Sequence, residues 1–151
     1  MNQPEILIVG AGGMGALFGS ILHENGLKVV LYDTNTEHIS AIQQAGLKIE
    51  GYGGDRTIPI AATSNLSELE SAEIIIFQCK SHGTRQAAKA VKPLVTQESV
   101  CISFQNGLGN EEVMAEELGN DFVMGGLTAM AGVLLEPGKI RDFSRVPSHI
   151  G

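Results

Sequence analysis

A glycine-rich segment between an apolar run and a helical segment constrains the fold of this chain more than any other feature. The apolar run, residues 6–9, is typical of a buried strand, and a helix is expected over residues 14–25, ended by Gly26. In such a strand–turn–helix unit, Gly10 permits the tight turn, Gly12 lets a phosphate approach the backbone, and Gly15 lets the helix pack closely on the strand. The N–H groups that begin the helix can then bind phosphate oxygens. The residues predicted to hold the pyrophosphate of a dinucleotide are Gly10, Ala11, Gly12, Gly13, Met14 and Gly15.

Short apolar runs alternate with helical segments along the rest of the chain. Further strands are expected at 28–32, 74–79, 100–104 and 122–124, and further helices at 37–44, 84–91 and 111–118. Shorter elements are expected as a strand pair at 47–50 and 57–60, a helical turn after Ser64 or Asn65, and a hairpin within 127–143. Strands that alternate with helices predict an α/β protein with a Rossmann-type, doubly wound, mostly parallel sheet. One dinucleotide-binding domain is expected over residues 1–151.

Composition and charge argue against several classes of function. The net charge of −7 and the lack of a basic run disfavour nucleic-acid binding. No apolar run approaches the roughly 20 residues of a membrane span, and residues 1–10 do not resemble a signal peptide, so a cytoplasmic protein with no membrane partner is expected. Cys79 and Cys101 lie in apolar runs and are expected to be buried, free thiols.

The four histidines are weak candidates for catalysis, and neither they nor the cysteines show the spacing of metal ligands, so no metal is expected. His23 and His38 lie on expected helices, and both are predicted to be at the surface. His82 is close enough to Lys80 to reach a ligand cleft, but helix capping or solvent exposure is the favoured explanation.

Polar residues follow three of the expected strands. Asp33 comes 18 residues after Gly15 at the end of the second strand, where a carboxylate accepts hydrogen bonds from the adenosine ribose. Lys80 and Asn106 follow two later strands, and ligands of open α/β sheets bind outside the carboxyl ends of the strands. A single cofactor cleft explains all of these positions. The alternatives are that Asp33 caps a helix, that Lys80 is a solvated loop residue, and that Asn106 belongs to a simple turn.

Together these motifs resemble the ketopantoate reductases (2-dehydropantoate 2-reductases), over essentially the whole chain. The most specific motif is the segment 105–111, Gln-Asn-Gly-Leu-Gly-Asn-Glu. The other matching segments are 8–15, 46–51, 79–80 and 148–151. The resemblance implies NADPH-linked reduction of 2-dehydropantoate to (R)-pantoate, a keto acid reduction of pantothenate biosynthesis.

The resemblance also implies roles for individual residues. Lys80 would lie beside the cofactor, Asn106 would bind both the cofactor and the substrate, and Ala131 would give a backbone contact to the cofactor. The proton-donating lysine of the family, its partner glutamate and a homodimer contact belong to a helical C-terminal domain, which we expect this chain to lack. No catalytic proton donor is therefore assigned, and the chain alone is expected to be inactive.

One departure from the family bears on the choice of cofactor. An arginine near the end of the second strand usually holds the 2′-phosphate of NADP, whereas this sequence has Asp33-Thr34-Asn35 there. The family thus implies NADP, but the carboxylate of Asp33 favours the free 2′-hydroxyl of NAD.

Two other functions use the same glycine motif. One is a different NAD-dependent 2-keto or 3-hydroxy acid dehydrogenase, which the Asn106 segment disfavours. The other is a regulatory module that senses NAD without chemistry, which would have no need of Lys80 and Asn106 near a reacting carbonyl.

Overall fold

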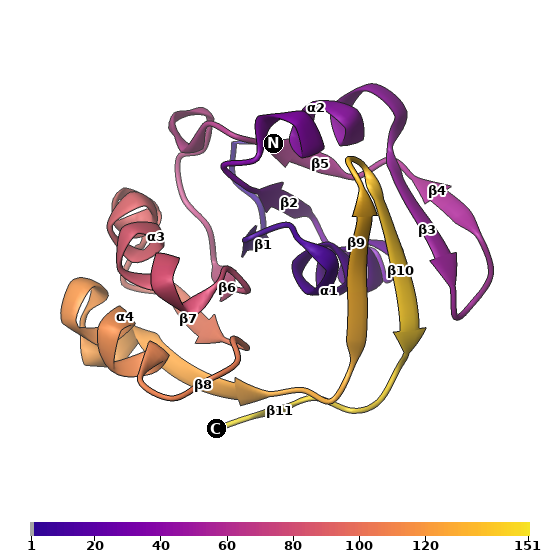
Figure 1. Cartoon of the computed structure of the whole chain (residues 1–151). Helices are drawn as coiled ribbons and strands as arrows, with labels where there is room; N and C mark the ends of the chain where they lie inside the picture. Colours follow the sequence, from indigo (N-terminus) through magenta and orange to yellow (C-terminus); the bar gives the residue numbers. More distant parts are fainter. Residues whose placement is uncertain (1) are drawn as a thin grey trace.

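A seven-stranded sheet with the order β11-β8-β7-β6-β1-β2-β5 forms the centre of the computed structural model, which describes residues 2–151 (Figure 1). Neighbouring strands are parallel, except that β11 pairs antiparallel with β8. The predicted doubly wound, mostly parallel sheet is therefore confirmed. The strands are β1 (Ile6–Val9), β2 (Val29–Tyr32), β5 (Ala61–Thr63), β6 (Ile74–Phe77), β7 (Val100–Ser103), β8 (Val123–Leu127) and β11 (His149–Ile150).

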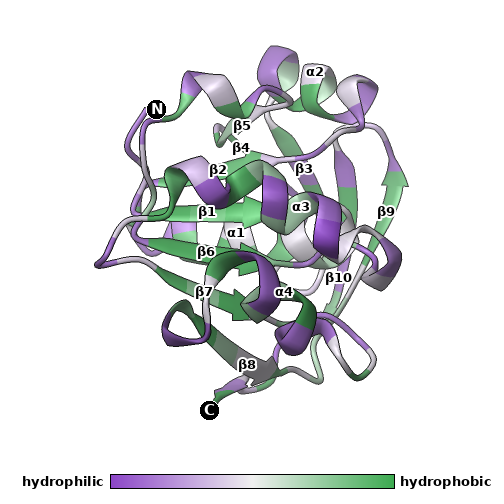
Figure 2. Ribbon diagram, turned by 90° about the vertical axis from the view of Figure 1, so that its left-hand side faces the viewer, coloured by the Kyte–Doolittle hydropathy of each residue, from purple (hydrophilic) through white to green (hydrophobic). Residues whose placement is uncertain are grey.

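Helices pack on both faces of this sheet. In Figure 1, α3 and α4 lie on one side and α1 lies on the other. Because both faces are covered, the central strands are continuous apolar runs, and Figure 2 shows β1, β6 and β7 as hydrophobic behind α3 and α4. The helices are α1 (Gly13–Glu24), α2 (Thr36–Ala45), α3 (Thr84–Val91) and α4 (Asn110–Leu118). The short 3-10 turns are η1 (Leu66–Glu68), η2 (Ser81–Gly83), η3 (Lys92–Leu94) and η4 (Asn120–Phe122).

Strand β1 divides the core into two clusters, because successive side chains of a strand point to opposite faces. Ile6 and Ile8 belong to the cluster that also contains residues of α1 and α2. Leu7 and Val9 belong to the cluster that contains residues of α3 and α4. All four side chains are at most 4% exposed, so β1 is fixed in place at the centre of the molecule and carries the glycine segment that follows it.

A second, four-stranded sheet with the order β4-β3-β10-β9 packs against α1 (Figure 1). Leu47, Ile49 and Ile140 of this sheet are buried in the same cluster as α1. The hairpin expected within 127–143 is present, but it also pairs with the first strand of the 47–60 segment, since β10 runs parallel to β3. Its strands are β3 (Leu47–Gly51), β4 (Arg56–Ile58), β9 (Ala131–Glu136) and β10 (Lys139–Ser144).

The elements differ from the predicted ones mainly at strand ends. The strand expected over 57–60 ends at Ile58, and a separate strand, β5, pairs with β2. Pro59 lies between the two, and proline cannot donate to a strand ladder. The strands expected to reach residues 79 and 104 end at Phe77 and Ser103, and the segment after Phe77 leaves the sheet to line a cleft. The helices agree with the predicted ranges to within one residue at each end.

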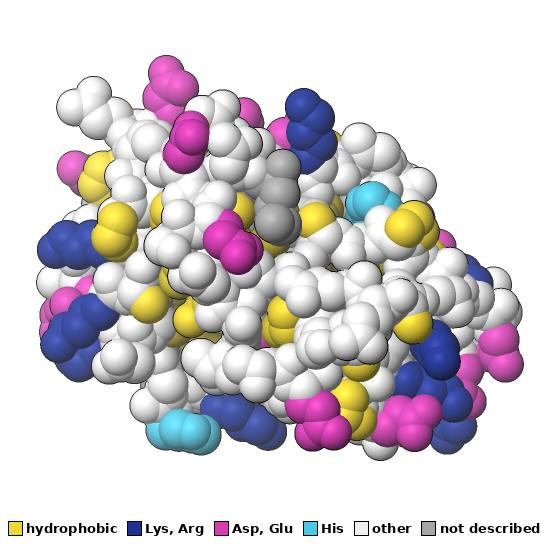
Figure 3. Space-filling view, turned by 90° about the horizontal axis from the view of Figure 1, so that it is seen from above, with side chains coloured by type: hydrophobic (Ala, Val, Ile, Leu, Met, Phe, Trp, Pro, Cys, Tyr) yellow, Lys and Arg dark blue, Asp and Glu magenta, His cyan; other side chains and the backbone are white. Residues whose placement is uncertain are grey.

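The expected helical turn after Ser64 or Asn65 is present as η1, and the side chain of Asn65 caps it by accepting a hydrogen bond from the Ser67 N–H at 3.1 Å. Over residues 2–151, no helix has both the length and the apolar character needed to cross a bilayer. Figure 3 shows Lys and Arg side chains interspersed with Asp and Glu on the face that it presents.

Candidate cofactor-binding cleft

The glycine segment after β1 makes a turn that only glycine accommodates at its first position. Gly10 has φ +97°, and its N–H donates to the Tyr32 carbonyl at 2.9 Å. A Cβ atom at Gly10 would lie 2.5 Å from the Cys79 backbone nitrogen. The segment after β1 and the segment after β6 are therefore in backbone contact, and any side chain at Gly10 would force them apart.

The other two glycines of the motif have opposite surroundings. A Cβ atom at Gly12, the N-cap residue of α1, would have nothing within 4 Å. A Cβ atom at Gly15 would overlap the Gly10 carbonyl oxygen, so α1 begins in direct contact with the turn. Gly12 therefore leaves open space in front of the helix N-terminus, where a phosphate is favoured by the helix dipole and the unpaired N–H groups.

Asp33 follows β2 directly, and its carboxylate bonds to the glycine segment. Its Oδ2 atom accepts a hydrogen bond from the Ala11 N–H at 2.7 Å, and its Oδ1 atom accepts one from the Asn35 N–H at 2.9 Å. The side chain is part-buried and lines the cleft. Each oxygen retains capacity to accept a further hydrogen bond, so Asp33 can support the segment and still face a ligand.

The prediction that His38 lies at the surface is wrong. His38 is on the first turn of α2 and is only 1% exposed, because the β9–β10 turn packs over it. Its ring lies between the Ala11 carbonyl, at 2.7 Å from Nε2, and the Gly138 N–H, which donates to Nδ1 at 2.9 Å. Its partner in the β9–β10 turn is 100 residues away in sequence, so no local pattern indicated this contact.

A cleft of about 490 Å³ opens at the carboxyl ends of β1, β2 and β6. Gln78 is in its wall, and the Nε2 atom of this side chain is buried without a hydrogen-bond partner within residues 2–151. Burial raises the pKa of the Tyr32 hydroxyl in the same wall, and the charge of Asp33 raises it further. The lining residues are Val9, Gly10, Gly12, Tyr32, Asp33, Thr34, Gln78, Cys79, Lys80, His82, Gly83, Gln86, Ala87 and Ala90.

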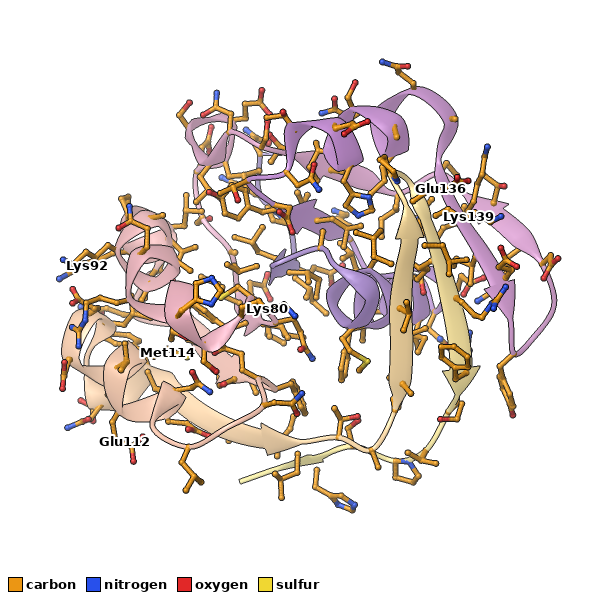
Figure 4. The ribbon with its side chains drawn as sticks, in the orientation of Figure 1. Lys80, Lys92, Glu112, Met114, Glu136 and Lys139 are labelled. Carbon is orange, nitrogen blue, oxygen red and sulfur yellow. The ribbon has the colours of Figure 1, made fainter. Side chains whose placement is uncertain are left out.

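Lys80 lines this cleft from the segment between β6 and α3. Figure 4 shows it near the middle of the molecule, between α3 and α1, whereas Lys92 lies at the periphery. His82 also lines the cleft, as its sequence position allowed.

Cys79 is half-buried beside Lys80, and desolvation raises the pKa of its thiol to about 11, from an ordinary value of 9.0. The thiol is therefore protonated near neutral pH and is a poor nucleophile there.

A polar network joins the segment after β7 to the segment after β6. The Asn106 carbonyl accepts hydrogen bonds from Ser81 Oγ at 2.8 Å and from Asn110 Nδ2 at 3.0 Å. Gln105 Nε2 donates to the Cys79 carbonyl at 2.9 Å and to Thr84 Oγ1 at 2.8 Å. These contacts hold Asn106 near Lys80, but the side chain of Asn106 is exposed and Asn106 is outside the cleft lining.

The sequence analysis assigned no role to the four residues whose side chains build this network. Two of them, Gln105 and Asn110, lie inside the segment that carried the family resemblance, and that segment is the signal that could have identified them. Ser81 and Thr84 carried no such signal, because hydroxyl side chains at the start of a helix are ordinary.

Ala131 is also outside the cleft lining, but the next residue, Gly132, packs against the Gly13 backbone. Among residues 2–151, no group of acidic, histidine or cysteine side chains is arranged to hold a metal ion.

Comparisons with known proteins find relatives over nearly the whole chain. The family model described as ketopantoate reductase PanE/ApbA matches residues 6–151. A 2-dehydropantoate 2-reductase of Pyrococcus abyssi is 36% identical over 147 residues, which are 97% of this chain and 47% of that protein. The chain thus spans about half the length of the curated relatives that it matches.

Solved structures share the fold over the same extent. A PanE/ApbA family ketopantoate reductase from Ralstonia eutropha superposes with a TM-score of 0.89 at 30% identity, covering 96% of this chain and 48% of that one. A D-mandelate dehydrogenase in complex with NADH superposes with a TM-score of 0.82 at 25% identity, covering 96% of this chain and 45% of that one. From the family match over nearly its whole length, the chain belongs to the ketopantoate reductase family.

Proposed function

We propose that residues 1–151 form the dinucleotide-binding domain of an oxidoreductase that reduces 2-dehydropantoate to (R)-pantoate with NADH or NADPH. The observation that carries the proposal is the cleft in which Gly10, Gly12, Asp33 and Lys80 meet at the carboxyl ends of parallel strands. Ligands bind at this edge of doubly wound sheets. The sequence similarity to 2-dehydropantoate 2-reductases supports the reaction class.

In this proposal the two sides of the cleft have different roles. The N-terminus of α1, with its open space at Gly12, binds the pyrophosphate, and Asp33 accepts hydrogen bonds from the adenosine ribose. Lys80 lines the cleft and offers a positive charge beside the cofactor. Asn106, held by Ser81 and Asn110, binds the nicotinamide side and the substrate, and Ala131 contributes a backbone contact.

A bound nicotinamide would supply the hydride to the keto carbon. The developing alkoxide also needs a proton donor. Lys80 lies in the cleft, but no residue of the cleft is assigned this role. By family resemblance the donor belongs to a further domain, through which a homodimer also forms.

Several exposed apolar side chains of β9 and β10 support packing against another protein segment, since monomers rarely expose large apolar patches. They are Val133, Leu134, Leu135 and Phe143.

Asp33 gives the proposed enzyme a preference for NAD over NADP. A 2′-phosphate beside Asp33 would meet a carboxylate with no arginine next to it in sequence. Arg56 does not reach this region, because it donates to Glu24 at 2.6 and 2.9 Å, at the far end of α1. That end is roughly 16 Å from the glycine segment, given about 1.5 Å of rise per residue.

The free thiols of Cys79 and Cys101 support a reducing compartment such as the cytoplasm as the location.

A second candidate is an NAD-dependent dehydrogenase for a different 2-keto acid. The structural similarity to D-mandelate dehydrogenase and the carboxylate of Asp33 favour it. A turnover assay of the full-length protein with 2-dehydropantoate and with phenylglyoxylate separates the two functions. We expect faster NADH oxidation with 2-dehydropantoate and no steady turnover by the 151-residue chain alone. Turnover with phenylglyoxylate only would replace the first function by the second.

A further inference from the structure

The peptide groups of Ala11 are held from both sides by two side chains of different elements. Asp33, after β2, accepts a hydrogen bond from the Ala11 N–H at 2.7 Å. His38, on α2, contacts the Ala11 carbonyl oxygen through Nε2 at 2.7 Å. Ala11 itself is fully buried. The middle of the glycine segment is therefore fixed by side chains as well as by its own turn.

The second contact of His38 determines which ring nitrogen carries the proton. The Gly138 N–H donates to Nδ1 at 2.9 Å, so Nδ1 must present a lone pair. In neutral imidazole the other nitrogen then carries the proton, and Nε2–H donates to the Ala11 carbonyl. The residue is only 1% exposed, so both hydrogen bonds are shielded from bulk water.

This contact sets the direction of the next N–H group in the glycine segment. In a trans peptide the carbonyl oxygen and the amide hydrogen point in opposite directions. When His38 holds the Ala11 carbonyl, the Gly12 N–H must point away from the ring. Gly12 is the N-cap of α1, and the space around its Cα is open. The ring of His38 therefore aims a backbone donor of the helix N-terminus.

We propose that His38 is a positioning residue for the cofactor phosphates, which it orients through the Ala11–Gly12 peptide. The proposal rests on the dinucleotide-binding function proposed above. It also ties that function to the β9–β10 turn, which supplies Gly138, and to β9, where Gly132 packs against the Gly13 carbonyl. His38 does not line the cleft, so it acts on the ligand only through the glycine segment.

Two substitutions separate the two hydrogen bonds of the ring. In His38→Gln, the side-chain amide nitrogen can reach the Ala11 carbonyl, whereas the Gly138 N–H loses its acceptor. In His38→Asn, the shorter side chain can accept from Gly138, whereas the Ala11 carbonyl loses its donor. Each variant leaves one buried backbone group unpaired, so both should lose similar stability. A purely structural role of His38 would therefore affect both variants alike.

Titration calorimetry of the 151-residue chain with NADH, with thermal unfolding as the control for stability, tests the proposal. We expect His38→Asn to raise the dissociation constant about tenfold, equivalent to about 1.4 kcal/mol, and His38→Gln to stay within about twofold of the parent chain. Equal affinities of two folded variants would overturn the role of His38 and leave the cofactor site standing. Failure of the parent chain to bind either NADH or NADPH would overturn the proposed function and this inference together.

A measurement on the unsubstituted chain covers the case in which a variant does not fold. Long-range ¹H–¹⁵N spectra report the tautomer of each histidine. We expect His38 to be the Nε2–H tautomer, and its ring nitrogen resonances to shift when NADH is added. The Nδ1–H tautomer, or unchanged resonances at saturating NADH, would contradict the proposal.

Discussion

Gly12 and Gly15 belong to one short motif, but a side chain would have different effects at the two positions. At Gly12 it would enter open space in front of α1, and at Gly15 it would overlap the Gly10 carbonyl. The first position is therefore constrained by what must approach from outside, and the second by packing within the chain. Asp33 combines both kinds of constraint, since it bonds to Ala11 and also lines the cleft.

Gly12→Val should abolish cofactor binding while sparing the fold. The new side chain fills the space that the pyrophosphate needs, and no protein atom lies within 4 Å of its Cβ position. Calorimetric titration with NADH and a thermal unfolding curve measure the two effects. Gly15→Val is the matched control, and it should lose the folded state itself. Unchanged NADH affinity in folded Gly12→Val would remove the glycine segment from the site.

The unsubstituted chain should bind NADH at least tenfold more tightly than NADPH. A carboxylate and a phosphate charge about 5 Å apart repel by about 3 kcal/mol at an effective dielectric constant near 20. Even part of this repulsion amounts to a factor of ten in affinity. Asp33→Asn, which removes the charge but keeps an acceptor for Ala11, should reduce the preference, and Thr34→Arg should reverse it. Dissociation constants are compared at one ionic strength, and tighter NADPH binding by the unsubstituted chain would show that Asp33 does not set the preference.

At the scale of elements, the β9–β10 hairpin contacts the helices beside the cleft without lining the cleft itself. It packs on α1, pairs with β3, and donates a hydrogen bond from the Gly138 N–H to His38 of α2. Alternating strands and helices, with the glycine motif, predicted the main sheet and its four helices, because these depend on local periodicity and local turns. The pairing of β10 with β3 and the burial of His38 could not be predicted, because each joins residues about 90 or more apart in sequence.

The candidate site shows the same division. The positions of Gly10, Asp33 and Lys80 in one cleft followed from the rule for strand ends, and the structure places them there. The cleft also takes in the wall of α3, with Gln86, Ala87 and Ala90, for which the sequence gave only helical periodicity. The same rule predicted Asn106 at the cleft, but Asn106 does not line it. Ala131 entered through the family resemblance alone and does not line the cleft either.

Gly132→Val should destabilise the chain by forcing β9 away from α1. A Cβ atom at Gly132 would lie 2.8 Å from the Gly13 carbonyl oxygen and 3.0 Å from Leu17 Cδ2. Overpacking of this kind costs about 1–3 kcal/mol, which urea unfolding resolves. Val133→Ala, at a neighbouring position that is 46% exposed, is the control and should change the free energy of unfolding by less than about 0.5 kcal/mol. Similar losses in both variants would mean that the close contact between β9 and α1 is not required.

At the scale of the whole molecule, one edge of the main sheet brings together segments that are far apart in sequence. The cleft draws residues from the ends of β1, β2 and β6, from the segments that follow these strands, and from α3. The second sheet packs against α1 through β9 and β10, so α1 lies between the two sheets. Since the chain spans about half the length of its curated relatives, the claim that this architecture supports most directly is cofactor binding rather than turnover.

Amide NMR of the isotope-labelled 151-residue chain during titration with NADH tests this claim most directly. The account predicts saturable shifts of the Gly10–Gly15 amides, with accompanying shifts at Asp33, Lys80 and Gly138. A second hollow lies between α2 and β4–β5 and is lined by residues that include Gln44, Gly46 and Thr57. The amides of these residues serve as the internal control and should not shift. Absence of saturable shifts, or shifts confined to that second hollow, would contradict the assignment of this cleft as a nicotinamide dinucleotide site.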